Sequence, residues 1–271
     1  MKGRAFIPVV IFAALVGCSK GNSDTPSAAQ TTGSDTKPTN AAAFRTLKTE
    51  DSVPGTGDGA KSGDTLTMLY HGSLVNGTVF DSNMSADGKP DTSKPPFALV
   101  LGMGQVIKGW DEGLKGIKVG CVRKIMIPSE MGYGAQGGGD KIPPNSDLVF
   151  TVKCLDIVHQ GEEKVIDIKD LKVGSGAEVK NGDKVTIHYV GTLLNGKQFD
   201  SSREKNQPFE FTVGAGEVVA GFDKGLLGMK RGGLRKLRIP PMAAYGANPN
   251  GGIPANSVLN FEIECLKING K

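Results

Sequence analysis

Several residue types that carry chemistry are scarce in this chain of 271 residues. It has 3 histidines, 4 cysteines and 1 tryptophan. No CxxC pair occurs, so a thioredoxin-type redox site is unsupported, and His71, His159 and His188 are not spaced to share a metal ion. Neither a GxGxxG nor a Walker-type phosphate loop is present. We therefore expect no cofactor and no metal.

The chain also lacks a large excess of charge of either sign. The formal net charge is +4, and without Lys2 and Arg4, which fall in the N-terminal segment discussed next, 30 basic residues face 28 acidic ones. A nucleic-acid-binding protein would show a basic footprint, so nucleic acid is not expected as a partner. The densest basic run, "MKRGGLRKLR" at 229–238, is interpreted as the solvated face of a strand.

No apolar run is long enough to span a membrane as a helix. The longest, 6–16, follows Lys2 and Arg4 and is typical of a signal peptide. The tetrapeptide "LVGC" at 15–18 resembles a bacterial lipobox, which implies cleavage before Cys18 and lipidation of that residue. A plain signal peptide with a chance cysteine is the alternative. We expect a signal peptide at 1–17, a lipid anchor on Cys18, and location in a bacterial cell envelope, with Ser19 indicating the outer membrane, on its periplasmic face or its surface.

The segment after the anchor lacks large apolar side chains up to residue 43. It consists mainly of Ser, Thr, Gly, Ala, Asp, Asn, Gln, Pro and Lys. Such a composition cannot bury enough surface to fold, so 18–43, counted from the lipidated cysteine, is predicted to be a disordered tether.

What the chain does contain is an internal repeat. "NGTVFDS" at 76–82 recurs as "NGKQFDS" at 195–201, and "RKIMIP" at 123–128 recurs as "RKLRIP" at 235–240. "GQVIKGWDEGL" recurs in the same order as "GEVVAGFDKGL". Because the blocks keep their order, we predict two copies of one domain, which we call copy 1 and copy 2, at 44–159 and 160–271. Copy 1 has seven extra residues, which we place in an enlarged polar surface loop at 82–96.

Each copy has many strands and little helix. In "DKVTIHYVG" at 183–191, apolar residues alternate with polar ones, as in a strand with one buried face. The same alternation in "LNFEIEC" at 259–265 places Cys265, and by analogy Cys154, in the core; whether Cys121 approaches Cys154 stays open. Only the segment at 106–117 and its repeat have helical periodicity. An α+β domain follows, with an antiparallel sheet folded across one short helix.

The apolar side chains of each copy include many aromatic rings, which suit a ligand pocket or an ordinary core. A two-carboxylate glycosidase is an alternative, since Asp200 and Asp223 recur as Asp81 and Asp111. Asp223, however, lies in the helical segment, where it would pair with Lys224 or solvent. A serine hydrolase would need a histidine partner that the sequence does not offer.

These blocks, from "HYVGTLLNGKQFDSS" to "IPANSVLNFEIECL", resemble an FKBP-type peptidyl-prolyl cis-trans isomerase domain, and copy 1 does so from "LYHGSLVNGTVFDS" to "IPPNSDLVFTVKCL". The resemblance implies two tandem domains, each a five- to six-stranded antiparallel sheet wrapped around one short helix. It also implies an aromatic pocket in each copy. The implied pocket residues of copy 2 are Tyr189, Phe199, Asp200, Phe209, Val218, Val219, Phe222, Tyr245, Ile253 and Phe261. Those of copy 1 are Tyr70, Phe80, Asp81, Phe97, Val106, Ile107, Trp110, Tyr133, Ile142 and Phe150.

The resemblance implies acceleration of X–Pro bond rotation in extracytoplasmic protein folding. Proline-containing unfolded or nascent polypeptides are the expected partners, and macrolide-type inhibitors the expected ligands. A backbone N–H, at Ile107 or Val219, would hold a substrate carbonyl, and the pocket aspartate would be a fixed polar group rather than an acid or base. Two departures are Gln105 in place of the family's usual Glu and Phe222 in place of its Trp. A tethered peptide-binding or chaperone module with weak catalysis is the alternative.

Overall fold

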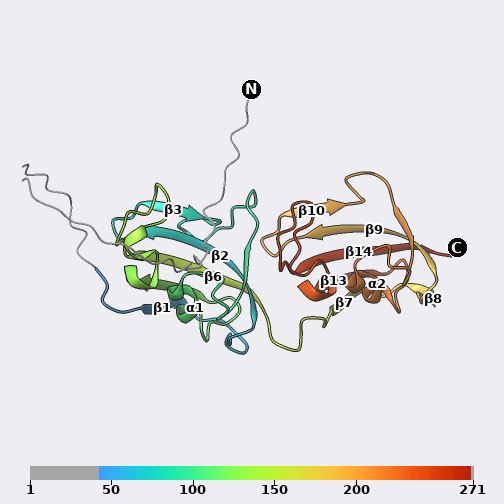
Figure 1. Cartoon of the computed structure of the whole chain (residues 1–271). Helices are drawn as coiled ribbons and strands as arrows, with labels where there is room; N and C mark the ends of the chain where they lie inside the picture. The colour runs from blue at the N-terminus through green and yellow to red at the C-terminus, as the bar shows by residue number, and fades with distance from the viewer. Residues whose placement is uncertain (1–42, 270–271) are drawn as a thin grey trace, which may run out of the picture.

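Alternating apolar side chains build two antiparallel sheets in the computed structural model, which describes residues 43–269 (Figure 1). On strand β9 (Lys184–Thr192), Val185 and Ile187 are fully buried, while Thr186 and His188 on the opposite face keep partial exposure. This is the burial expected when one face of a strand covers a core. The predicted α+β class, with sheets of about six strands and one short helix in each copy, is confirmed.

The first sheet lies in the blue-to-green half of Figure 1. Its strand order is β1-β5-β6-β2-β3, with β4 also paired to β2. The strands are β1 (Lys48–Val53), β2 (Thr65–Leu74), β3 (Val79–Ser82), β4 (Phe97–Val100), β5 (Val122–Ile127) and β6 (Leu148–Val158). Helix α1 (Lys108–Gly113) packs on β5, and two 3-10 helices, η1 (Ser129–Met131) and η2 (Gly134–Gln136), follow.

The second sheet repeats this plan in the yellow-to-red half of Figure 1. Its order is β10-β9-β14-β13-β7, with β11 also paired to β9. The strands are β7 (Asp167–Lys172), β9 (Lys184–Thr192), β10 (Gln198–Ser201), β11 (Phe209–Thr212), β13 (Leu234–Ile239) and β14 (Leu259–Ile268). Helix α2 (Ala220–Leu226), 3-10 helix η3 (Pro241–Ala243) and a small ribbon of β8 (Ser175–Glu178) and β12 (Lys230–Arg231) complete this copy.

Helix α2 lies close against the sheet because glycine faces it. A Cβ added to Gly225 would lie 2.4 Å from the Leu237 Cδ1 atom on β13. Glycine costs a helix interior up to about 1 kcal/mol relative to alanine, so close packing offsets a poor helix propensity here. The helix is shorter than the periodic segment suggested, and within residues 43–269 no helix is long and apolar enough to cross a membrane.

The basic run at 229–238 is a solvated strand face only in part, because Lys236 is exposed whereas Arg235 lies on the buried face of β13. Arg235 is only 6% exposed. Its guanidinium donates to the main-chain oxygens of Gly225 and Leu227, both at 2.8 Å, and to the Asp170 carboxylate at 2.6 and 3.1 Å. The arginine thus binds carbonyls that the end of helix α2 leaves unpaired. Arg123 repeats this arrangement in copy 1.

The cysteines of both cores are free thiols. Cys154 and Cys265 are fully buried, as the strand alternation predicted, and Cys121 is 1% exposed. One main-chain hydrogen bond joins Cys154 to Cys121, yet the two thiols form no disulfide. Burial raises the pKa of Cys154 to about 12. These thiols are therefore core side chains that stay protonated.

Candidate functional site

A ring at the start of helix α2 forms the floor of a cavity in copy 2. Phe222 is 4% exposed and meets Tyr189 and Phe261 edge-to-face, with ring centroids 6.0 and 4.9 Å apart. Phe199 in turn meets Phe261 edge-to-face at 5.6 Å. Such aromatic pairs are favourable beyond their buried area, so the rings hold one another in place around the cavity.

The cavity encloses about 350 Å³, and all ten residues predicted for the copy 2 pocket line it. They come from β9, β10, β11, the start of α2, and the segment between β13 and β14, together with β14 itself. Lys205, Glu217, Asn250 and Gly251 complete the lining. The structure therefore brings together residues that are up to 72 positions apart, at Tyr189 and Phe261.

Asp200 is a fixed polar group at the edge of this cavity. It accepts hydrogen bonds from the Tyr189 hydroxyl and the Lys205 ammonium, both at 2.5 Å, and from the Ser201 N–H at 2.8 Å. Partial burial raises the pKa of Asp200, but Lys205 and Tyr189 together lower it below its ordinary value. Burial and the neighbouring carboxylate raise the pKa of Tyr189. At neutral pH the carboxylate is ionised and the phenol protonated, so neither is poised to exchange a proton.

The N–H of Val219 lies at the start of helix α2 and has no hydrogen-bond acceptor within the described residues. Val219 is half-buried and lines the cavity. An unpaired N–H beside this cavity can donate a hydrogen bond to a carbonyl oxygen of a bound peptide. The Asp223 carboxylate, in the first turn of helix α2, is 8% exposed. It accepts from the Gly214 N–H at 2.9 Å, rather than pairing with Lys224 or solvent as the sequence suggested. Asp223 therefore fixes the loop before the helix.

Gly191 was not predicted from the sequence as part of the site. Because it has no side chain, it leaves room for two of the rings that line the cavity. A Cβ at this position on β9 would lie 2.7 Å from the ring of Phe199 and 2.9 Å from that of Phe261. Gly72 relates in the same way to Phe80 and Phe150 in copy 1. The glycine within "HYVG" was a visible signal, because an isolated glycine in a strand pattern indicates close approach of another group.

The predicted residues of copy 1 form an equivalent cluster. Trp110 is fully buried and contacts Tyr70, Phe97 and Phe150 edge-to-face, with centroids 5.7, 5.8 and 5.2 Å apart. The Tyr70 hydroxyl donates to Asp81 at 2.6 Å. Phe80, Val106, Ile107 and Ile142 belong to the same buried cluster, and Tyr133 packs against it.

Two features distinguish the copies. Lys141 donates to the main-chain oxygen of Phe80 at 3.2 Å, whereas Lys205 in copy 2 pairs with the aspartate itself. Gln105 accepts from the Val100 N–H of β4 at 2.9 Å, and Glu217 accepts from the Thr212 N–H of β11 at 3.2 Å. The change from Glu to Gln therefore keeps the hydrogen bond and removes a negative charge.

A family model described as FKBP-type peptidyl-prolyl cis-trans isomerase matches residues 57–155 and 176–266. The chain belongs to this family. It contains two FKBP domains, so domain 1 and domain 2 below denote copy 1 and copy 2.

Curated relatives are similar to this chain over part of their own length. Human peptidyl-prolyl cis-trans isomerase FKBP10 is 38% identical over 223 residues, which cover 81% of this chain and 37% of the relative. FK506-binding protein 4 of Chaetomium thermophilum is 50% identical over 103 residues, covering 38% of this chain and 21% of that protein. Among solved structures, FkpA from Escherichia coli is 39% identical, with coverage of 38% of this chain and 47% of that chain and a TM-score of 0.36. The chain thus spans well under half the length of these curated relatives.

Proposed function

We propose that both FKBP domains accelerate cis–trans rotation of X–Pro bonds in unfolded or nascent polypeptides. One observation carries the proposal: ten aromatic, aliphatic and acidic residues from six separate segments line one cavity, and beside it lies the Val219 N–H, which has no acceptor within residues 43–269. The family match supports the same activity.

The reaction needs no nucleophile. Rotation of an X–Pro amide has a barrier of about 18–20 kcal/mol because the planar C–N bond has partial double-bond character. The proline ring would pack on Phe222, and the Val219 N–H would hold a neighbouring carbonyl. The aromatic rings around the proline disfavour the more polar planar amide relative to the twisted one. Tighter binding of the twisted state than of either planar state is sufficient for catalysis.

A proline-limited peptide isomerisation assay on the full chain tests this proposal. We expect acceleration that falls when Phe199 or Tyr245 is replaced by alanine in a chain whose domain 1 carries the matching Phe80→Ala or Tyr133→Ala change. Binding of the same peptides without any acceleration would favour the tethered chaperone module instead.

We propose further that the protein acts outside the cytoplasm, held to a bacterial envelope membrane by lipid on Cys18. The lipobox-like "LVGC" supports this proposal, and Cys18 lies outside the described residues. Cell fractionation should find the wild-type chain with the membrane and a Cys18→Ala chain elsewhere. Mass spectrometry of the mature N-terminus should show acyl chains; an unmodified Cys18 would contradict the proposal.

Macrolide-type inhibitors should bind domain 2 more weakly than domain 1, because Phe222 offers less surface than Trp110.

A further inference from the structure

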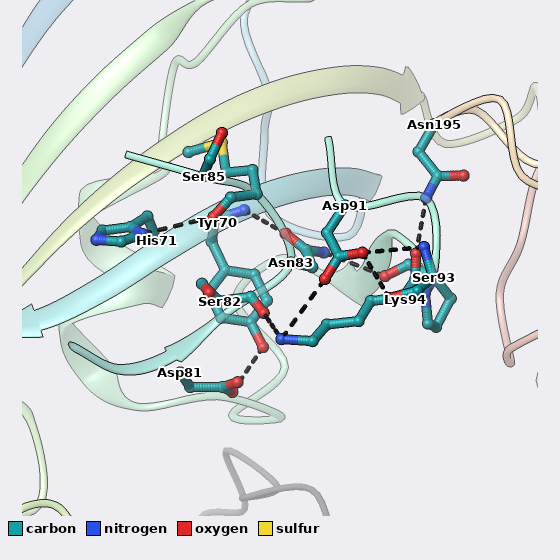
Figure 2. A network of polar contacts seen from close by, with 12 residues as sticks. Tyr70, His71, Asp81, Ser82, Asn83, Ser85, Asp91, Ser93, Lys94 and Asn195 are labelled. Carbon is teal, nitrogen blue, oxygen red and sulfur yellow. Dashed lines mark hydrogen bonds and ion pairs between the residues drawn. The ribbon is translucent and has the colours of Figure 1, made fainter. Parts of the chain in front are cut away.

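The loop between β3 and β4, residues 83–96, is mostly exposed, and hydrogen bonds at its base give it a defined fold. Asn83 is 3% exposed, and its side chain accepts from the Tyr70 N–H at 2.6 Å. Its amide donates to the Pro95 main-chain oxygen at 3.2 Å, which closes the loop on itself. Lys94 donates to the main-chain oxygen of Ser82 at 2.6 Å, at the end of β3 (Figure 2).

The C-terminal part of this loop contacts domain 2. The Asn195 side-chain amide, in the β9–β10 turn, donates to the main-chain oxygen of Lys94 at 2.7 Å (Figure 2). Lys197 in the same turn donates to the main-chain oxygen of Ser93 at 3.2 Å. Asp91 accepts from the Ser93 N–H at 3.0 Å and so holds the two acceptor carbonyls in a defined turn.

The repeat supplies an internal comparison for this contact. Both "NG" turns contain the same local hydrogen bond at 3.0 Å, from the Thr78 N–H to Asn76 and from the Lys197 N–H to Asn195. Asn76 is nevertheless exposed, whereas Asn195 is 7% exposed. The local turn is shared, so the burial of Asn195 comes from outside the turn, where the loop of domain 1 contacts it.

A second contact joins the domains near the segment that links β6 to β7. Arg238 on β13 pairs with Asp156 at the end of β6 and with Asp167 on β7, the latter at 3.0 Å. The Asp156 side chain is 13% exposed. In domain 1 a methionine, Met126, occupies the position of Arg238, so this pair belongs to the junction rather than to the repeated fold.

We infer that loop 83–96 is an interdomain brace: it holds the Asn195 turn of domain 2 and, with the Asp156–Arg238 pair, fixes the two FKBP domains as one body. The turn continues directly into β10, which carries Phe199 and Asp200. The brace therefore also positions one wall of the second pocket from the first domain. This inference does not depend on the proposed catalysis, because it concerns contacts that exist without substrate.

An exchange of loops within the protein provides the test. Replacing residues 83–96 by "SREKNQP", the shorter segment at 202–208, removes the brace while keeping a loop that already connects the same strands in domain 2. Nuclear relaxation of backbone ¹⁵N on the full chain reports how each domain tumbles. We expect one shared correlation time in the wild type and a shorter one for each domain in a chain with the exchanged loop and Arg238→Met. Independent tumbling in the wild type, or unchanged tumbling in this variant, would overturn the inference.

Two single substitutions test the hydrogen bond itself. Asn195→Ala and Asn76→Ala both remove the local turn bond, but only the first removes a bond to the other domain. The Leu193 amide donates to the Lys197 main-chain oxygen at 2.8 Å, and the Leu74 amide donates at the equivalent place in domain 1. Hydrogen exchange of the Leu193 amide in the Asn195→Ala variant should accelerate about tenfold more than that of the Leu74 amide in the Asn76→Ala variant. Equal acceleration in both would contradict the brace. The emission of Trp110, in domain 1, should stay unchanged in both variants and so confirm folding of that domain.

Discussion

Replacing Asp200 by asparagine separates a fixed polar group from a catalytic acid or base. The ion pair with Lys205 joins side chains that are 36% and 63% exposed, so its loss costs about 0–1 kcal/mol. The hydrogen bond from Tyr189 becomes neutral rather than charge-assisted, which costs about 1 kcal/mol more. Together these changes, about 1–2 kcal/mol, should lower kcat/KM by about 5–30-fold. Loss of a general acid or base would instead cost about 10²–10⁴-fold.

The assay is proline-limited isomerisation of a short peptide by the Asp81→Asn, Asp200→Asn double variant, so that domain 1 does not hide the effect. Lys205→Ala, which removes the ion pair alone, should change the rate less than about fivefold. Because the pKa of Asp200 lies below its ordinary value, the carboxylate stays charged from pH 6 to 8 and the wild-type rate should be flat there. A loss above about 100-fold in the folded double variant, or a bell-shaped profile in that range, would refute the reasoning.

Three other substitutions or reactions address the framework of domain 2. Arg235→Ala should lower the free energy of unfolding by about 2–4 kcal/mol in urea denaturation, because helix carbonyls and a carboxylate lose their donor; full rescue by lysine would contradict the need for a planar fork. Gly191→Ala should cost about 1–3 kcal/mol of stability and weaken peptide binding, as the rings of Phe199 and Phe261 must move; unchanged binding by titration calorimetry would exclude this contact. Burial raises the pKa of Cys265, so a thiol reagent at pH 8 should label Cys265 in the native protein only as fast as the core opens, and immediate labelling of Cys265 itself would disprove a closed core.

Much of the fold was predictable because the repeat and the strand alternation are local signals. The period-2 pattern around Val185 and Ile187 indicated a strand with one buried face, and the structure places both residues in the core. The pocket residues were predictable only through the family resemblance. Tyr189 and Phe261 lie on different strands and line the same cavity. Sequence spacing alone does not show that two such residues lie close together.

The remaining features depend on contacts between distant segments. Arg235 looks like a surface residue in sequence, since most arginines are exposed, and only the end of helix α2 above it explains its burial. Loop 83–96 has the composition of a solvated loop, yet Asn83 is buried because it bonds to the main chain of Tyr70. Polar side chains like these become predictable when the position of their hydrogen-bond partners is known.

The aromatic cluster of domain 1 also gives the protein an optical label. Trp110 is the single tryptophan of the chain and is fully buried, while the corresponding residue of domain 2 is Phe222. Excitation at a wavelength that tyrosine does not absorb therefore addresses domain 1 alone. Any change of that emission on adding a peptide or a denaturant can be assigned to the first domain without mutation, and unfolding of the second domain by itself leaves the signal unchanged.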